Sequence, residues 1–179
     1  MPAPQGLKAM LNFQMHVNGA NLDHAMIRLV KMRVSQINGC AYCLDMHSKD
    51  ARAAGETEQR LYLLSAWREV TLYSPRERAA LEWAEALTLV SETHVPDEAY
   101  EAARAQFSEQ ELVDLSLAVV AINGWNRLQV AFRAQAGTYR PGPGLTRLAD
   151  GAHLAGPATT AEEGIAAIRL EAGHVDARG

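Results

Sequence analysis

The sequence lacks an excess of basic residues and any long apolar run. It holds 17 lysines and arginines against 21 aspartates and glutamates, for a net charge of −4, and its arginines are scattered. A nucleic-acid partner or a polybasic membrane patch is therefore not expected. No apolar stretch approaches the length of a membrane span, and the first residues lack the charged start and apolar run of a signal peptide. We expect a cytoplasmic protein with no membrane contact.

Cysteine is scarce, because Cys40 and Cys43 are the only two in 179 residues. In the cytoplasm a close pair is more often catalytic or metal-binding than structural. Structural zinc takes four protein ligands, so a zinc site would need His47 and either His24 or His94 beside the pair. Nothing in the sequence fixes either histidine nearby, and we predict neither a metal nor another cofactor. Two inert cysteines packed in the core are the remaining structural alternative.

Alternating β-branched runs are also missing, whereas apolar residues recur with a period of 3.6, which predicts an all-α protein. Ser74 and Ser108 each begin a capping box, with a glutamate three residues later. Residues 1–20 are expected to be an irregular lead-in. The expected helices are Leu22 to about Ile37, the cysteine pair to about Ala54, a segment after Thr57 that carries Trp67, 74 to about 95, 97 to about 106, and 108 to about 132.

The composition changes near residue 135. Residues 136–160 are rich in Gly, Pro, Ala and Thr, which is typical of a linker. We therefore predict one helical domain over 1–135 and a Gly/Pro-rich C-terminal extension over 136–179, with a short helix possible at 161–172. The extension either packs on a neighbouring subunit or stays disordered.

Cys40, Cys43 and His47 have the spacing of a redox-active dithiol with its base. On one helix they would project from a single face, since Cys43 lies about 60° and His47 about 20° from Cys40. With Asn38 or Gly39 as N-cap, Cys40 would stand in the first helical turn, where unpaired N–H groups favour a thiolate. A disulfide between the two would be strained and exposed, hence easily reduced. His47, with an ordinary pKa of ~6.5, would take the thiol proton.

The stretch from Lys31 to His47 resembles the motif of the alkylhydroperoxidase D-like (AhpD-like), carboxymuconolactone decarboxylase superfamily. Asp50-Ala51-Arg52, Gly55-Glu56 and Ala121–Arg127 continue the resemblance, which covers about residues 7–135. It implies an all-α bundle that assembles into trimers or hexamers. Its redox branch reduces hydroperoxides and carries a cysteine pair that the decarboxylase branch lacks. By this resemblance Cys43 attacks the peroxide, Cys40 donates a proton and closes the disulfide, and His47 belongs to the proton relay.

One position departs from the family pattern. The family relay includes a glutamate twelve residues before the first cysteine, and here that residue is Arg28. A guanidinium stays charged and relays no proton, although Arg28 could stabilise a thiolate. Glu82 could replace the missing carboxylate, or it could be a surface charge.

The leading hypothesis is therefore a peroxidase-type antioxidant enzyme that an external dithiol or protein reductant regenerates. The alternatives are a thiol–disulfide oxidoreductase that serves a protein partner, and a non-enzymatic oligomeric scaffold whose cysteines hold metal or merely pack.

Overall fold

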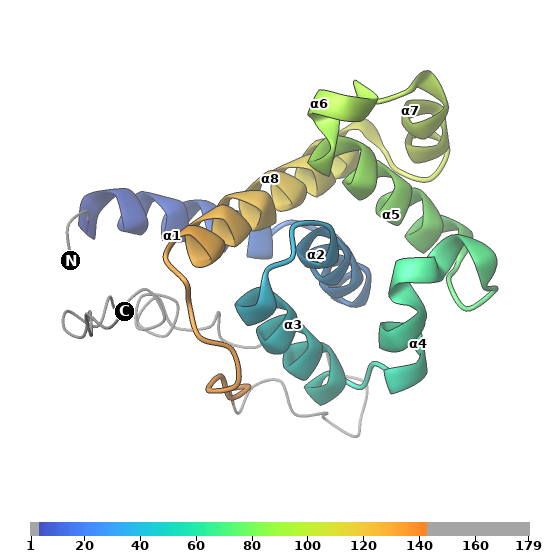
Figure 1. The fold of residues 1–179 in the computed structure, drawn as a ribbon. Coiled ribbons are helices and arrows are strands. Elements are labelled where there is room, and N and C mark those ends of the chain that lie inside the picture. The colour runs from blue at the N-terminus through green and yellow to red at the C-terminus, as the bar shows by residue number, and fades with distance from the viewer. Residues whose placement is uncertain (1–3, 143–179) are drawn as a thin grey trace, which may run out of the picture.

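The structure is a computed structural model that describes residues 4–142, and every regular element in that range is a helix (Figure 1). The predicted all-α fold is confirmed. The elements are α1 (Pro4–Asn18), α2 (His24–Ile37), α3 (Ala41–Ala53), α4 (Glu58–Leu63), the 3-10 helix η1 (Leu64–Glu69), α5 (Pro75–Thr88), α6 (Val90–Thr93), α7 (Asp97–Arg104) and α8 (Glu109–Ala131).

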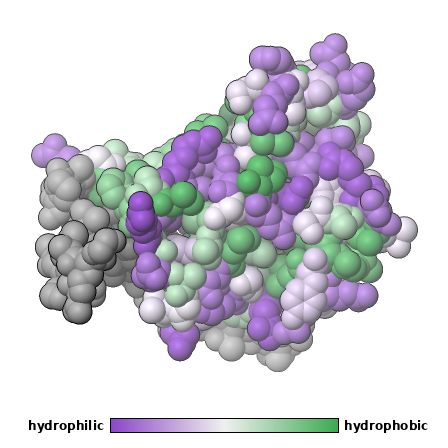
Figure 2. Space-filling view, in the orientation of Figure 1, coloured by the Kyte–Doolittle hydropathy of each residue, from purple (hydrophilic) through white to green (hydrophobic). Residues whose placement is uncertain are grey.

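α2 is the central helix, and it packs against α3, α5 and α8 (Figure 1). Met26, Val30 and Val34 lie buried along it. They join a main core to which α8 contributes Leu115 and Val119. Each such side chain stabilises the fold by about 1.5–3 kcal/mol on burial. On the outer face in Figure 2, hydrophilic side chains surround smaller hydrophobic areas.

Both capping boxes form as the sequence predicts. The Ser74 hydroxyl accepts a hydrogen bond from the Glu77 backbone N–H, and the Glu77 carboxylate accepts one from the Ser74 N–H, at the start of α5. Ser108 and Glu111 make the same pair of bonds at the start of α8. Thr57 caps α4, also as expected.

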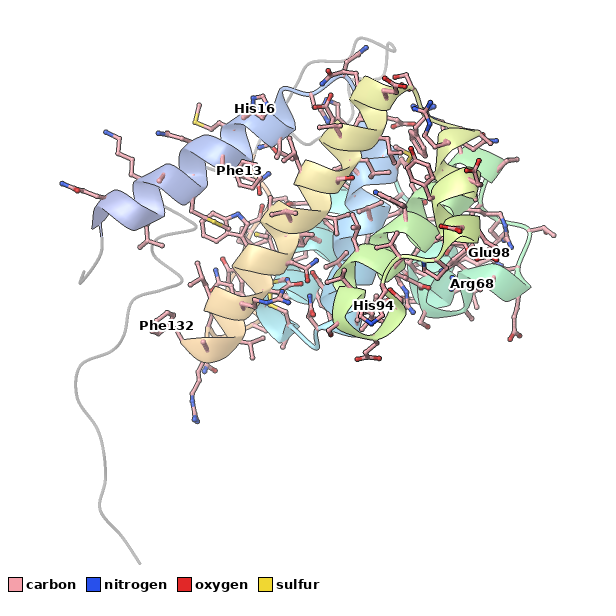
Figure 3. The ribbon with its side chains drawn as sticks, turned by 90° about the horizontal axis from the view of Figure 1, so that it is seen from above. Phe13, His16, Arg68, His94, Glu98 and Phe132 are labelled. Atoms are coloured by element: carbon pink, nitrogen blue, oxygen red, sulfur yellow. A yellow bond between two sulfur atoms is a disulfide. The ribbon has the colours of Figure 1, made fainter. Side chains whose placement is uncertain are left out.

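The expectation of an irregular lead-in over residues 1–20 is wrong, because residues 4–18 form α1. Pro4 stands at the first helical position, where its missing N–H costs nothing. Met10, Phe13 and Val17 follow helical spacing and face α8, and Figure 3 shows Phe13 on the side of α1 toward that helix. The approach is close, since a Cβ on Gly124 of α8 would lie 2.5 Å from the Met10 methyl carbon. The helix therefore depends on a contact more than 100 residues away in sequence.

Two further boundaries differ from the sequence prediction. The helix that starts at Ser74 stops at Thr88 and is followed by the short α6, where the expected helix continued to about 95. Residues 137–139 were expected to be linker, yet Tyr139 is buried against α3. The domain limit at 135 stays a prediction, and the possible helix at 161–172 lies outside the described residues.

No helix in the described part is both long enough and apolar enough to cross a membrane.

Candidate redox site

Cys40 and Cys43 form a disulfide at the start of α3, with their Cα atoms 5.3 Å apart. Cys40 is the N-cap of that helix and has an extended backbone. The expectation that Asn38 or Gly39 would be the N-cap, with Cys40 in the first turn, is therefore wrong. Its sulfur accepts a hydrogen bond from the Cys43 backbone N–H at 3.3 Å. The sulfur thus takes the place of a capping oxygen, beside the partial positive charge of the helix N-terminus. This environment favours a thiolate when the pair is reduced.

The turn that delivers Cys40 to this position ends α2. Gly39 has a φ of +63°, and the Cys40 and Gly39 N–H groups donate to the carbonyls of Ser35 and Gln36. This is the Schellman arrangement, which needs a left-handed residue after the C-cap. The predicted helix end near Ile37 and the next helix start at the cysteine pair are confirmed, and the turn between them sets the direction of α3.

Polar side chains of α8 hold this turn in place by hydrogen bonds. The Asn38 Nδ2 donates to the Oδ1 atoms of Asn123, at 3.0 Å, and of Asn126, at 2.9 Å. Asn126 is fully buried and donates in turn to the Ser35 hydroxyl. These bonds join α8 to the C-terminal end of α2 and to the turn that leads to Cys40. The sequence places Asn126 in the Ala121–Arg127 stretch that continues the resemblance, but its partners lie too far away in sequence to be predicted.

The sulfur atoms are covered. Cys40 and Cys43 are each 1% exposed and form a small apolar cluster with Tyr42, against which Met46 and Ala134 pack. The expectation of an exposed disulfide is therefore wrong. It rested on the position of the pair at a helix start, and it missed the chain after α8, which returns over this end of α3 (Figure 1).

His47 lies one turn beyond Cys43 and is 8% exposed. Its Nε2 atom is buried without a hydrogen-bond partner, a property shared in the described residues only by the Gln129 Oε1. Burial, together with the nearby Lys31 ammonium, lowers the pKa of His47 to about 3. His47 is thus a neutral imidazole in the oxidised site, where the sequence predicted an ordinary pKa.

Lys31, whose charge acts on this imidazole, belongs to a group of charged side chains on or next to α2 and α3. Burial lowers the pKa of Lys31 to about 8, with a further decrease from Arg28 and an opposing increase from Asp50. Burial also lowers the pKa of Arg28, against the carboxylates of Asp23, Asp50 and Glu56. The Arg28 position therefore holds a cation balanced by carboxylates, and Asp50 interacts with both basic side chains.

Two further sequence predictions concern Glu82 and a metal site. Glu82, on α5, forms an ion pair with Arg68 of η1 at 3.7 Å and is more than a third exposed. Glu82 is thus a surface charge in an ion pair, which was the alternative to a relay role. A relay role for Glu82 stays a prediction. The described residues contain no group of three or more His, Cys, Asp or Glu side chains that could hold a metal ion.

An all-helical fold with a buried Cys-X-X-Cys pair at the start of a helix defines the class, that of AhpD-like helical proteins. The chain belongs to the carboxymuconolactone decarboxylase family. The model of that family matches residues 4–86. The uncharacterised protein YdfG of Bacillus subtilis is 47% identical over 129 residues, which are 72% of this chain and 88% of YdfG.

Solved structures agree with this assignment. A protein of unknown function from Agrobacterium tumefaciens, ATU0492, is assigned provisionally as the antioxidant defence protein AhpD. It is 45% identical to this chain with a TM-score of 0.73, over 76% of this chain and 93% of its own. The debrominase Bmp8 is 18% identical with a TM-score of 0.63, over 73% of this chain and 70% of its own, and that likeness concerns the fold alone.

Proposed function

We propose that the protein is an alkylhydroperoxidase-like peroxidase, an antioxidant oxidoreductase that works through a Cys40–Cys43 dithiol/disulfide cycle. The observation that carries the proposal is the disulfide itself, which caps α3 one turn before a buried histidine with an unpartnered Nε2. The fold alone does not select this reaction, because the same fold serves a debrominase.

The cycle follows ordinary thiol chemistry. The Cys43 thiolate attacks the hydroperoxide, the O–O bond breaks and Cys43 becomes a sulfenic acid, while the departing alkoxide takes the Cys40 thiol proton and leaves as an alcohol. The Cys40 thiolate then attacks the Cys43 sulfur, the hydroxyl group leaves as water with the proton that His47 took from Cys43, and the disulfide closes. An external dithiol supplies the two electrons and two protons that reopen it.

His47 supplies the base in this scheme. When the disulfide opens, the Cys43 thiol is available to the vacant Nε2 one helical turn away. Proton transfer would create a thiolate beside the imidazolium, and that negative charge opposes the burial and the Lys31 charge that lower the pKa of His47. The pair is therefore expected to ionise together, as a thiolate–imidazolium couple.

One observation favours a second function, thiol–disulfide exchange with a protein partner. Arg28 stands where the family relay has its glutamate, and its guanidinium delivers no proton to a departing alkoxide. Exchange requires a thiolate but no such donor. The hydroperoxide substrate, the dithiol reductant, the trimeric or hexameric assembly and the cytoplasmic location stay predictions.

A thiol titration before and after one equivalent of cumene hydroperoxide tests the proposal. We expect the reduced protein to lose both of its two thiols. Slow peroxide consumption with rapid reduction of the disulfide by lipoamide or thioredoxin would favour the exchange function. Bound zinc with an unchanged thiol titre would favour the scaffold.

Three variants test the assigned roles. Cys43→Ser is expected to lose peroxide turnover, and Cys40→Ser to consume one equivalent and stop as a sulfenic acid that dimedone labels. His47→Gln is expected to slow turnover about 10²-fold, as loss of a general base does. Peroxide turnover by Cys43→Ser at the rate of the unmodified protein would disprove the mechanism.

A further inference from the structure

The chain after α8 returns over the cysteine pair. α8 ends in a second Schellman turn, in which Arg133 has a φ of +56° and the Ala134 N–H donates to the Gln129 carbonyl at 3.0 Å. A non-glycine residue in this conformation costs about 1 kcal/mol, so the surrounding contacts must maintain the turn. Beyond it, the segment runs beside α3 (Figure 1). We call residues 134–140 the strap.

The strap contacts α3 at three successive levels. Ala134 packs on the cluster of Cys40, Tyr42 and Cys43. The Gly137 N–H donates to the Asp45 carboxylate at 2.9 Å, two residues beyond Cys43. The contacts of the strap thus begin at the cysteine pair and continue along α3 toward its C-terminal end.

At the last level, Tyr139 is held through both its side chain and its backbone. The Tyr139 hydroxyl donates to the Asp50 carboxylate at 2.7 Å, and the Lys49 ammonium donates to the Tyr139 carbonyl at 3.1 Å. Lys49 also binds the Asp45 carboxylate, so the two polar levels share one cation. Tyr139 is only 7% exposed, although it lies after the last helix in a segment rich in glycine and proline. Tyr139 is therefore buried and hydrogen-bonded through both its hydroxyl and its carbonyl group, which fixes the strap on α3.

We propose that the strap selects among reductants by size, because it must lift from α3 before a protein dithiol can reach the Cys40–Cys43 disulfide. Tyr139 is the specificity-determining residue, and it acts through its bond to Asp50. Thiol exchange needs a thiolate to approach one sulfur along the S–S axis. With Cys40 and Cys43 each 1% exposed and with Ala134 and Met46 packed on their cluster, the closed form presents no surface on which a protein-sized partner could achieve that approach. A small dithiol needs a smaller opening.

The step that the strap controls is ordinary thiol–disulfide exchange. A thiolate of the reductant forms a mixed disulfide with one cysteine and releases the other as a thiolate, which takes a proton. The second thiol of the reductant then closes its own disulfide and frees the remaining cysteine. Two electrons pass to the protein in total. The proposal rests on the proposed function only in requiring that the disulfide be opened by an external dithiol.

The test measures the opening of the disulfide in the oxidised full-length chain without any peroxide, so a failure of the peroxidase function leaves it intact. Dithiothreitol and reduced thioredoxin serve as the small and the protein-sized reductant. Free thiols are trapped with an alkylating agent and counted by intact mass at successive times. Tyr139→Phe removes the hydroxyl and leaves the charge unchanged. We expect reduction by thioredoxin to become roughly tenfold faster and reduction by dithiothreitol to accelerate less, as the loss of one hydrogen bond to a carboxylate allows.

The matched control is Tyr62→Phe. The Tyr62 hydroxyl also donates to a carboxylate, that of Glu58 at 2.9 Å, but the side chain is 71% exposed on α4. The rates at which thioredoxin and dithiothreitol reduce the disulfide of Tyr62→Phe should equal those of the unmodified protein. Lys49→Met provides a second test of the strap, because it removes the donor to the Tyr139 carbonyl. Loss of a cation would slow the approach of an anionic thiolate, so a faster reduction in this variant reports release of the strap.

Two results would overturn the proposal. One is a pair of Tyr139→Phe rates within twofold of the parent for both reductants. The other is an equal increase for both reductants together with a lower unfolding temperature, which would mean that the variant loosens the whole fold.

Discussion

The chemistry of His47 in the folded protein departs strongly from its chemistry in water, because its pKa is lowered to about 3. Its phase on the helix follows from the sequence, since it stands four residues after Cys43. Its protonation does not, because burial and the Lys31 charge come from the packing of α2 on α3. The same holds for Cys40, whose place at the N-cap is set by the turn at Gly39.

The low pKa of His47 predicts a loss of stability in acid. In the unfolded chain the imidazole binds a proton below about pH 6.5, whereas in the folded protein it does so only below about pH 3. Between these values the unfolded state binds one more proton, so the free energy of unfolding falls as the pH is lowered, by up to ~1.4 kcal/mol per pH unit from this residue. Urea unfolding of the oxidised protein between pH 4.5 and 7.5 measures this slope. We expect a smaller slope in His47→Gln.

The control for that slope is His16→Gln, which alters an exposed histidine on α1 and leaves His47 in place. This variant should retain the parent slope. A general destabilisation by the His47 substitution would displace the curve equally at every pH, so parallel curves for His47→Gln and the parent would contradict the low pKa.

At the scale of the elements, the sequence predicts those features that depend only on neighbouring residues. The boxes at Ser74 and Ser108 and the cap at Thr57 each depend on atoms within three residues, and all three form as predicted. α1 was missed, since its formation depends on packing along α8. The Asn38–Asn126 bond escaped prediction for the same reason.

The turn between α2 and α3 permits a direct test of the backbone requirement at Gly39. A Cβ there would meet no atom within 4 Å, but the residue has a φ of +63°. Gly39→Ala is therefore expected to lower the free energy of unfolding by about 1 kcal/mol, from backbone conformation alone. Urea unfolding measures the change. Gly6→Ala, at an open position of α1, should cause no decrease, and an unchanged stability of Gly39→Ala would show that the turn tolerates any residue.

At the scale of the whole molecule, large apolar side chains lie exposed along α8 and directly after its last residue. They include Val120, Val130 and Phe132, each about half exposed, and Figure 3 shows Phe132 pointing away from the body at the end of this helix. Contacts between copies of the chain would remove such side chains from water. Exposed apolar surface of this kind suits the predicted assembly without specifying its symmetry.

We accordingly predict a solution mass of three or six times the 19.5 kDa of one chain. Light scattering after size exclusion, over a hundredfold range of concentration, measures it. A mass of one chain at every concentration would contradict the assembly.

The sequence by itself determined the helical class, most helix starts, and the phase that gives Cys43 and His47 a common face, because these depend on neighbours within one or two turns. Tertiary structure alone decided that the sulfurs are covered, that the imidazole is neutral and that Tyr139 fastens a strap. Those properties come from solvent exclusion and from partners some 90 residues apart, such as Asp50 and Tyr139, which no local pattern encodes.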